Sequence, residues 1–174
     1  MRGLIPLIVF GVIAIALAIG LTNDPRRMED MLIDQPFPEF SLPTLYEPET
    51  QHSKSDIQNQ VSLINVFGSW CVTCIVEHPV LMNIAETETV RLIGHNWRDE
   101  RDKAITWLAR QGNPYDSIIF DPDSTLAISL GVTAAPETFI TDKQGRIRYK
   151  HSGDITEKDW ETVLKPLIES LQAE

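Results

Sequence analysis

The chain has 174 residues, with 15 lysines and arginines against 25 aspartates and glutamates, so its formal net charge is −10. This length allows one domain with a hydrophobic core and excludes a large multi-domain assembly, and the acidic balance argues against nucleic acid as a partner. The only two cysteines are Cys71 and Cys74, which excludes a scaffold of several disulfides and an all-cysteine zinc site.

The chain begins with a long apolar run. Residues 4–21 are 18 consecutive residues without a charged or polar side chain. As a helix they would span about 27 Å, close to the hydrocarbon thickness of a bilayer. A cleaved signal peptide is the alternative, because Ala16-Leu17-Ala18 resembles a cleavage site, but the run is longer than a usual signal-peptide core. We predict an N-terminal transmembrane helix (residues 1–22) that contacts the lipid bilayer through residues 4–21.

The flanking charges do not settle the orientation of this helix, because Arg2 precedes the run while Arg26 and Arg27 follow it. The signal-like position of the run favours export of the rest of the chain. Residues 23–36 are short, polar and rich in proline at their borders, so we interpret them as a tether to a domain over residues 37–174.

The remaining chain alternates β-type and helical segments. The segment Phe37–Leu45 contains two prolines and can form only an edge strand or an irregular entry. Strands are predicted at Val61–Phe67, Val90–Asn96, Ile118–Asp121, Glu137–Thr141 and Ile147–His151. Helices are predicted from Cys71 to about Ala85 with a kink at Pro79, and at Arg101–Gln111, Ser124–Leu130 and Thr156–Leu171. This order predicts an α/β three-layer sandwich with a mixed β-sheet.

The two cysteines form a Cys-x-x-Cys pair at the junction of a strand and a helix. The positive end of the helix dipole and its free N–H groups stabilise a thiolate there, so Cys71 is the predicted nucleophile. Cys74 lies one turn further and could attack a mixed disulfide on Cys71. Trp70 would present a flat apolar surface beside the nucleophile.

Two other roles for the pair remain open at this point. A structural disulfide across two residues closes almost no loop and would stabilise the fold little. A two-thiolate site for Cu(I) is chemically reasonable, although no methionine or cysteine cluster lies nearby in the sequence. The strand and helix around the pair favour redox exchange.

The residues around the pair resemble a known family. The segment Val61–Leu81, with Trp70-Cys71-Val72-Thr73-Cys74 and Glu77-His78-Pro79, resembles the active-site segment of membrane-anchored thioredoxin-like reductases. Gly131–Asp142, with Gly145–His151, resembles the thiol:disulfide interchange proteins of cytochrome c maturation, the DsbE/CcmG type. Trp107–Asp121, with Gly112-Asn113-Pro114-Tyr115, is similar to the same family, and the resemblance extends over essentially the whole chain.

The resemblance implies a thioredoxin-like fold and a reductase held in the bacterial inner membrane by one span, with its C-terminal domain in the periplasm. Its dithiol would reduce the Cys-x-x-Cys-His segment of an apocytochrome c before haem attachment, and a membrane thiol-electron donor would reduce it again. No cofactor and no metal are implied. The chain lacks a haem attachment motif of its own, because Ile75 follows Cys74.

The resemblance also implies roles for single residues. Cys71 would attack and Cys74 would resolve, while Pro136 would be the cis-proline that faces the dithiol. The preceding Ala135 would offer its backbone to an extended substrate.

Two acidic residues have alternative interpretations. Glu77 would tune the thiols or relay a proton, its alternative being a solvated helix face. Glu137 would add to an acidic surface around the groove, its alternative being an outward-pointing strand residue. His78 and His151 are interpreted as structural.

The chain departs from the family pattern at two positions. Val72 follows the first cysteine where the family commonly has proline, and this position influences the redox potential of the pair. Ala134 stands where glycine is usual, which would reshape the substrate-facing loop slightly. Two rival functions remain: an anchored reductase for other exported thiols, and a Cu(I) chaperone that uses Cys71 and Cys74.

Overall fold

The computed structural model describes residues 9–15, 17 and 32–174. Residues 9–15 and 17 are helical. The other residues of the predicted anchor, and residues 23–31 of the predicted tether, lie outside the described part of the chain. Within the described residues, no helix combines the length and the apolar character needed to cross a membrane.

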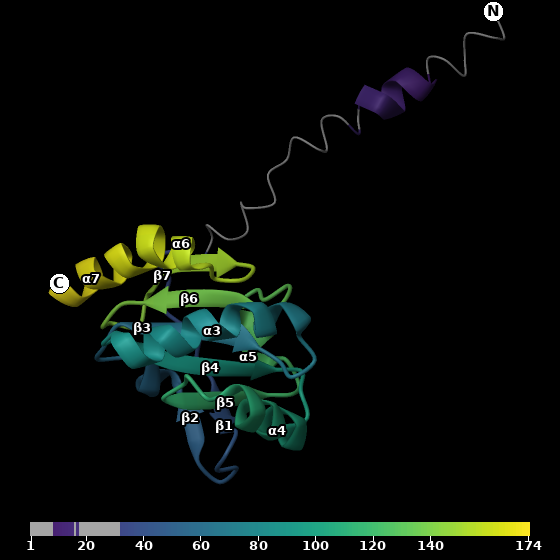
Figure 1. Ribbon diagram of the computed structural model, residues 1–174. Helices are drawn as coiled ribbons and strands as arrows, with labels where there is room; N and C mark the ends of the chain where they lie inside the picture. Colours follow the sequence, from purple (N-terminus) through teal and green to yellow (C-terminus); the bar gives the residue numbers. More distant parts are fainter. Residues whose placement is uncertain (1–8, 16, 18–31) are drawn as a thin grey trace, which may run out of the picture. The chain divides into compact units, whose positions relative to one another are not determined.

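The domain is organised around a five-stranded sheet (Figure 1). Its strands are β3 (Ser62–Phe67), β4 (Arg91–Trp97), β5 (Ser117–Asp121), β6 (Glu137–Thr141) and β7 (Ile147–Ser152). Their order across the sheet is β5-β4-β3-β6-β7. Strands β3, β4 and β5 are parallel to one another, and β6 is antiparallel to both of its neighbours, β3 and β7. The central strand β3 is buried along its whole length, as is usual for a mostly apolar strand in the middle of a sheet.

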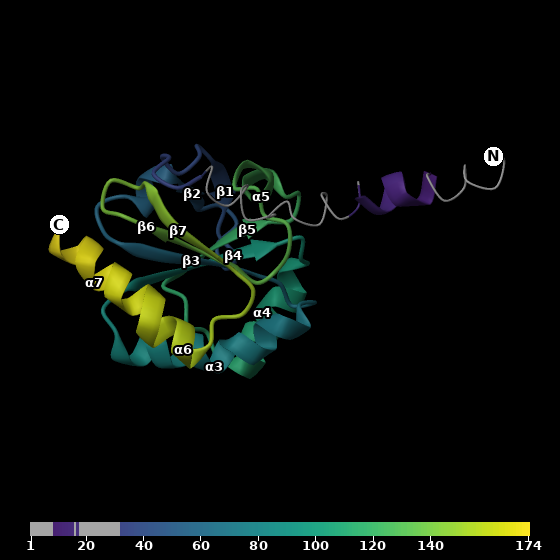
Figure 2. The ribbon, with the colours of Figure 1, turned by 90° about the horizontal axis from the view of Figure 1, so that it is seen from above.

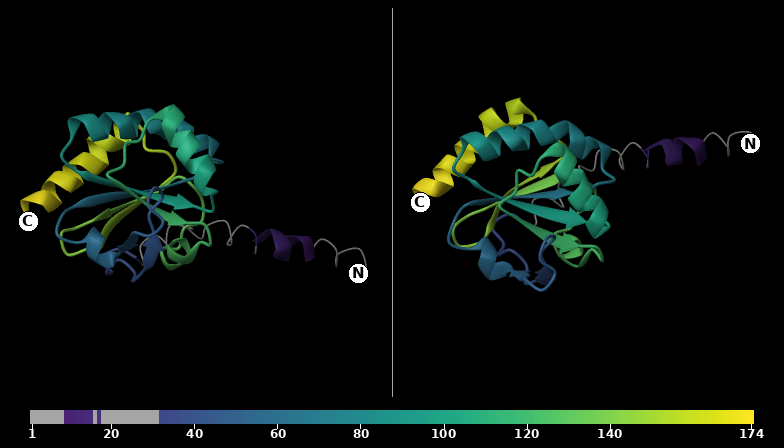
Figure 3. Two further views of the ribbon diagram at one scale, coloured as in Figure 1. Left: turned by 90° about the horizontal axis from the view of Figure 1, so that it is seen from below. Right: turned by 60° about the horizontal axis from the view of Figure 1, so that its bottom comes forward.

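Helices cover both faces of the sheet (Figures 2 and 3). The helices are α3 (Val72–Thr87), α4 (Arg101–Gln111), α5 (Thr125–Ser129), α6 (Glu157–Asp159) and α7 (Lys165–Ala173). Helices α3, α4, α6 and α7 lie on one face and α5 on the other. The predicted three-layer sandwich with a mixed sheet is confirmed.

Each face of the sheet has its own hydrophobic core. Side chains alternate along β3, so that Leu63 and Phe67 enter the core beneath α3 while Ile64 and Val66 enter the core beneath α5. Asn65 also points toward the α3 side by this alternation, and it is fully buried. A polar side chain therefore lies in the middle of the strand, between two apolar neighbours and under α3.

The compact unit begins at Leu32, earlier than the predicted domain start at Phe37. Leu32 and Ile33 pack against the core on the α5 side, and the Asp34 N–H donates to the Ile147 carbonyl at 2.7 Å. These contacts join the segment to the edge of the sheet at β7.

The segment Phe37–Leu45 contains only the short strand β1 (Ser41–Pro43). It pairs with β2 (Gln51–Ser53) in a separate two-stranded sheet, followed by the 3₁₀-helix η1 (Lys54–Ile57). The short strand agrees with the confinement of proline to strand edges. Helix α3 continues on both sides of Pro79.

The prediction of one continuous α-helix over Thr156–Leu171 is wrong in its middle part. The Thr156–Asp159 capping box is present, but α6 is followed by a π-helical turn, η2 (Trp160–Leu164), before α7 begins. The Lys165 N–H bonds the Trp160 carbonyl, five residues back. Pro166 has no N–H to donate, and the wide turn places it in the first turn of α7, where a helix tolerates proline.

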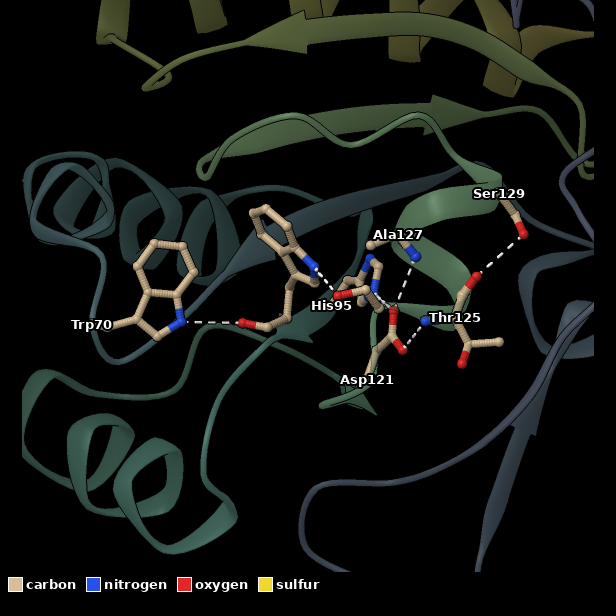
Figure 4. A network of polar contacts seen from close by, with 8 residues as sticks. Trp70, His95, Asp121, Thr125, Ala127 and Ser129 are labelled. Atoms are coloured by element: carbon tan, nitrogen blue, oxygen red, sulfur yellow. Dashed lines mark hydrogen bonds and ion pairs between the residues drawn. The ribbon is translucent and has the colours of Figure 1, made fainter.

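The start of α5 depends on one buried carboxylate. Asp121 Oδ1 accepts the Thr125 N–H at 2.6 Å, and Oδ2 accepts the Ala127 N–H at 2.9 Å and lies 2.9 Å from His95 Nε2 (Figure 4). Burial raises the pKa of Asp121, but the hydrogen bonds from His95, Ala127 and Thr125 more than offset this effect and hold it below the ordinary value.

We expect Asp121→Asn to lower the free energy of unfolding by about 2–4 kcal/mol, because the new amide N–H₂ would face a donor in either orientation. Urea unfolding at neutral pH measures this loss, with Asp123→Asn at an exposed neighbouring position as the control. Because the pKa of Asp121 is lower in the folded than in the unfolded chain, its stabilisation is complete above the unfolded value and is lost as the pH falls through the folded one. The difference between the two proteins should therefore shrink in acid, and a constant difference down to pH 2 would contradict this account.

Candidate active site

The cysteine pair lies where the central strand passes into α3. Cys71 is the N-cap residue of α3, and its N–H donates to the Gly68 carbonyl at 3.0 Å. The two sulfur atoms form a disulfide of 2.05 Å. Both cysteines are buried. The predicted position of the pair, at the end of a central strand and the start of a helix, is confirmed.

The start of α3 provides the electrostatic environment of the pair. The Cys74 N–H donates to Cys71 Sγ at 3.1 Å, so the sulfur takes the place of the side-chain oxygen of an ordinary N-cap. The positive end of the helix dipole and this N–H would both stabilise a thiolate on Cys71 after reduction. This arrangement favours Cys71 over Cys74 as the sulfur that carries the negative charge.

A loop that precedes β6 faces the disulfide. The Ala135–Pro136 peptide bond is cis, as the resemblance implies for Pro136. The Ala135 carbonyl oxygen lies 3.4 Å from Cys71 Sγ. The register of the sheet explains this approach, because Val66 near the end of β3 pairs with Glu137 at the start of β6.

Glu137 lies inside the protein, which corrects both sequence interpretations of this residue. It is 1% exposed, and its carboxylate forms an ion pair with Lys150 at 3.0 Å. It also accepts the N–H and the hydroxyl of Thr133, at 3.1 and 2.9 Å, and Lys150 donates to the Gly131 carbonyl at 3.1 Å. The pair holds the loop that faces the dithiol instead of forming an acidic surface, because a buried carboxylate needs a cation and donors around it.

Glu77 is also buried, with 1% of its surface exposed, so the solvated helix face is wrong. Its Oε1 accepts from Asn65 Nδ2 at 2.9 Å, and its Oε2 accepts the Ile155 N–H at 3.1 Å. Burial raises the pKa of Glu77 to about 7, with the two hydrogen bonds opposing the rise and Asp154 adding to it. Glu77 lies one turn after Cys74 on the same buried face of α3. It is therefore a carboxyl group that can gain or lose a proton near neutral pH beside the dithiol.

Trp70 is 49% exposed and stands beside the disulfide. Its Nε1–H donates to the Trp97 carbonyl at 3.2 Å, which fixes the indole (Figure 4). A Cβ at Gly68 would lie 2.5 Å from that nitrogen, so the indole requires a glycine there. Val72, the residue after Cys71, is exposed too, as is Val76 on the same helix.

Four residues that position the site were not identified from the sequence. Asp99 accepts the Ser69 hydroxyl at 2.7 Å and holds the turn before Cys71. The others are Asn65 and Tyr115, which form a buried chain to Glu77, and Lys150, which pairs with Glu137. The isolated polar residue in an apolar strand was a usable signal for Asn65, whereas the partners of Asp99, Tyr115 and Lys150 are distant in sequence.

The two histidines interpreted as structural, His78 and His151, both lie against backbone carbonyl groups. His78 Nε2 lies 3.1 Å from the Gly112 carbonyl, and burial lowers the pKa of its imidazole. His151 Nε2 lies 3.1 Å from the Asp154 carbonyl. Across the described residues, no group of three or more histidine, cysteine, aspartate and glutamate side chains could hold a metal ion.

Known proteins are similar to this chain in sequence and in fold. The family model described as Redoxin matches residues 33–164. The thiol:disulfide interchange protein DsbE of Allochromatium vinosum is 44% identical over 171 residues, which cover 98% of this chain and 94% of that protein. A secreted thiol-disulfide isomerase from Corynebacterium glutamicum has a TM-score of 0.66 at 34% identity, over 76% of this chain and 85% of the other. A thioredoxin-like superfamily protein at 18% identity, with a TM-score of 0.67 over 80% of this chain and 97% of the other, shares the fold.

The matches agree with the geometry of the site. A thioredoxin-like fold with a mixed sheet is confirmed, and thiol:disulfide oxidoreductase activity follows from the cysteine pair at the start of α3 together with the near full-length relationship to DsbE. The chain belongs to the Redoxin family and, by its similarity over almost its whole length, to the DsbE thiol:disulfide interchange proteins.

Proposed function

We propose that this protein is a periplasmic reductase, anchored in the bacterial inner membrane through residues 4–21, that reduces the Cys-x-x-Cys-His disulfide of apocytochromes c before haem attachment. The observation that carries the proposal is the Cys71–Cys74 pair at the N-terminus of α3, with Cys71 Sγ 3.4 Å from the carbonyl oxygen of the cis Ala135–Pro136 bond. The resemblance of Gly131–Asp142 to the cytochrome c maturation proteins supports the substrate class. The apolar run supports the anchor, and the description of the Corynebacterium glutamicum relative as secreted supports export.

The exchange proceeds in two steps. In the reduced protein, the Cys71 thiolate attacks one sulfur of the substrate disulfide; a new Cys71–substrate S–S bond forms, and the other substrate sulfur leaves as a thiolate that takes up a proton. Cys74 then loses its proton and attacks Cys71 Sγ, which releases the second substrate sulfur as a thiolate. The substrate is reduced by two electrons, and the protein ends with the Cys71–Cys74 disulfide.

Substrate binding and proton transfer are assigned to residues around the cysteine pair. The backbone of Ala135 is proposed to bind the substrate segment in extended form, and Trp70 is proposed to contact residues that flank its disulfide. Glu77 is proposed to accept the Cys74 proton in the second step, because its pKa of about 7 allows it to be a base at neutral pH. A membrane thiol-electron donor then returns the Cys71–Cys74 disulfide to the dithiol.

The substrate class is tested in a strain from which the gene is deleted. We expect the strain to lose all c-type cytochromes and to regain them when a thiol reductant is added to the medium, because the missing step is a reduction. Haem staining of membrane and periplasmic fractions measures the effect, and complementation with the intact gene is the control. Unchanged cytochrome levels would refute the proposed substrate and favour a reductase for other exported thiols.

The roles of the two cysteines are tested by trapping. Cys74→Ser should accumulate a mixed disulfide between Cys71 and a peptide that contains the Cys-x-x-Cys-His segment, because the resolving thiol is absent. Mass spectrometry of the purified adduct identifies the bonded sulfur. The matched variant is Cys71→Ser, and accumulation of the adduct on its Cys74 instead would reverse the assignment.

The role of Glu77 is tested by Glu77→Gln. We expect the step in which Cys74 resolves the mixed disulfide to slow by about 10²-fold at neutral pH, since a positioned base is lost. Stopped-flow exchange across pH 5–9 should show a limb near pH 7 in the natural protein that disappears in the variant. Glu86→Gln, an exposed change on the same helix, is the control, and a limb that persists in Glu77→Gln would exclude Glu77 as the base.

A further inference from the structure

The segment Gly112–Tyr115, between α4 and β5, delivers one phenol to the interior of the domain. The side chain of Asn113 accepts the Tyr115 N–H at 3.1 Å. The next residue, Asp116, bonds β4 twice at 2.8 Å: its N–H donates to the Leu92 carbonyl, and its carboxylate accepts the Leu92 N–H. His78 of α3 lies against the Gly112 carbonyl. The loop is therefore attached both to the sheet and to the helix that carries the dithiol.

The Tyr115 ring lies over β4, on the face of the sheet covered by α3, in the space left by a glycine. Gly94 on β4 is the direct partner of Asn65 on β3. A Cβ at Gly94 would lie 3.0 Å from the Tyr115 ring and 2.9 Å from Phe67, and the two rings are stacked with their centroids 4.9 Å apart. The absence of a side chain at Gly94 lets the phenol pass over β4, and its hydroxyl donates to Asn65 Oδ1 at 2.7 Å.

The amide oxygen of Asn65 and both of its N–H donors have hydrogen-bond partners. Its oxygen accepts from Tyr115, and its nitrogen donates to Glu77 Oε1 at 2.9 Å and to Thr138 Oγ1 at 3.0 Å. Burial raises the pKa of Tyr115 well above its ordinary value, so the phenol stays a donor at neutral pH. Because the Tyr115 hydroxyl donates a hydrogen bond to the amide oxygen, the amide nitrogen of Asn65 is turned toward Glu77.

Glu77 therefore meets donors at both carboxylate oxygens, one from Asn65 and one from the Ile155 N–H. Such surroundings suit the ionised carboxylate and disfavour the protonated form, which would need an acceptor. The titratable groups that face Glu77 are Asp154 before α6, Tyr115 from its loop, and Cys74 one turn away on α3. Of these, Asp154 disfavours ionisation of Glu77. Asn65 is the side chain whose hydrogen bond favours ionisation.

We propose that Asn65 is the positioning residue of Glu77 and that Tyr115, carried by the Gly112–Tyr115 segment, orients it: together they supply the donor that keeps the buried carboxylate able to ionise at neutral pH. The proposal deepens the function above and rests on the role of Glu77 as proton acceptor. Within the described part of the chain, neither side chain forms a hydrogen bond with Cys71 Sγ or Cys74 Sγ. Both residues act through Glu77.

The test follows the titration of Glu77 itself. In the oxidised protein the cysteines do not titrate, so carbon-detected NMR of labelled glutamate carboxyls reports the midpoint directly, with Glu77→Gln identifying the resonance. We expect Asn65→Ala to raise the midpoint by about one to two pH units, since a hydrogen bond to the charged form is lost. Tyr115→Phe should raise it by roughly half a unit or more, because the amide loses its orientation.

Tyr149→Phe is the matched control, since it removes a hydroxyl from another tyrosine packed against the same core, and it should leave the midpoint unchanged. Circular dichroism verifies folding, and if Asn65→Ala does not fold, Tyr115→Phe decides. A Glu77 midpoint that stays within about 0.3 unit in the folded variants would overturn the proposal, as would an equal rise in Tyr149→Phe. Loss of the pH 7 limb in Glu77→Gln remains a separate result, so failure of the proton-acceptor role and failure of the positioning role are distinguishable.

Discussion

The central position of β3 in the sheet is the constraint on which the site depends. Its parallel partner β4 and its antiparallel partner β6 leave no free edge, and its last residues deliver Cys71 to the start of α3. The antiparallel register with β6 brings Glu137 opposite Val66, so the Ala135–Pro136 loop arrives beside a cysteine that lies more than sixty residues earlier in the chain. A one-residue slip would move every side chain of the strand to the other face and separate the loop from the dithiol.

Three of the buried carboxylates, Glu137, Asp121 and Glu77, have different environments. Glu137 pairs with Lys150 and holds the loop before β6, and Asp121 accepts donors from the start of α5, so both carboxylates hold backbone segments in place. Glu77 has donors but no cation, and burial raises its pKa to about 7. Burial favours the protonated form of a carboxyl group, whereas hydrogen bonds donated to the carboxylate favour the ionised form. Glu77 differs from Asp121 in this balance, because for Glu77 burial outweighs the hydrogen bonds.

Much of the fold could be predicted because local patterns agree with tertiary packing. Three features depend only on neighbours within a few residues: the β-type segment that forms β3, Gly112 at the end of α4, and the Thr156 capping box. The C-terminal helix could be predicted only in part. Pro166 cannot donate a backbone hydrogen bond, and the spacing of apolar residues does not reveal the π-helical turn that precedes it. The early start of the domain at Leu32 was missed because its contacts are with β7, far along the chain.

The sequence by itself determined the reactive centre: two cysteines spaced for exchange, placed where a strand passes into a helix, with a proline-containing loop whose residues resemble those of a known family. The tertiary structure alone decided what the acidic residues do. Periodicity cannot tell a buried acid from a solvated one on a helix such as α3, because burial depends on what other elements bring against it. For Glu77 those elements are β3 with Asn65 and a loop that passes Tyr115 over Gly94, and hydrogen bonds between residues so distant in sequence form only when the sheet is assembled.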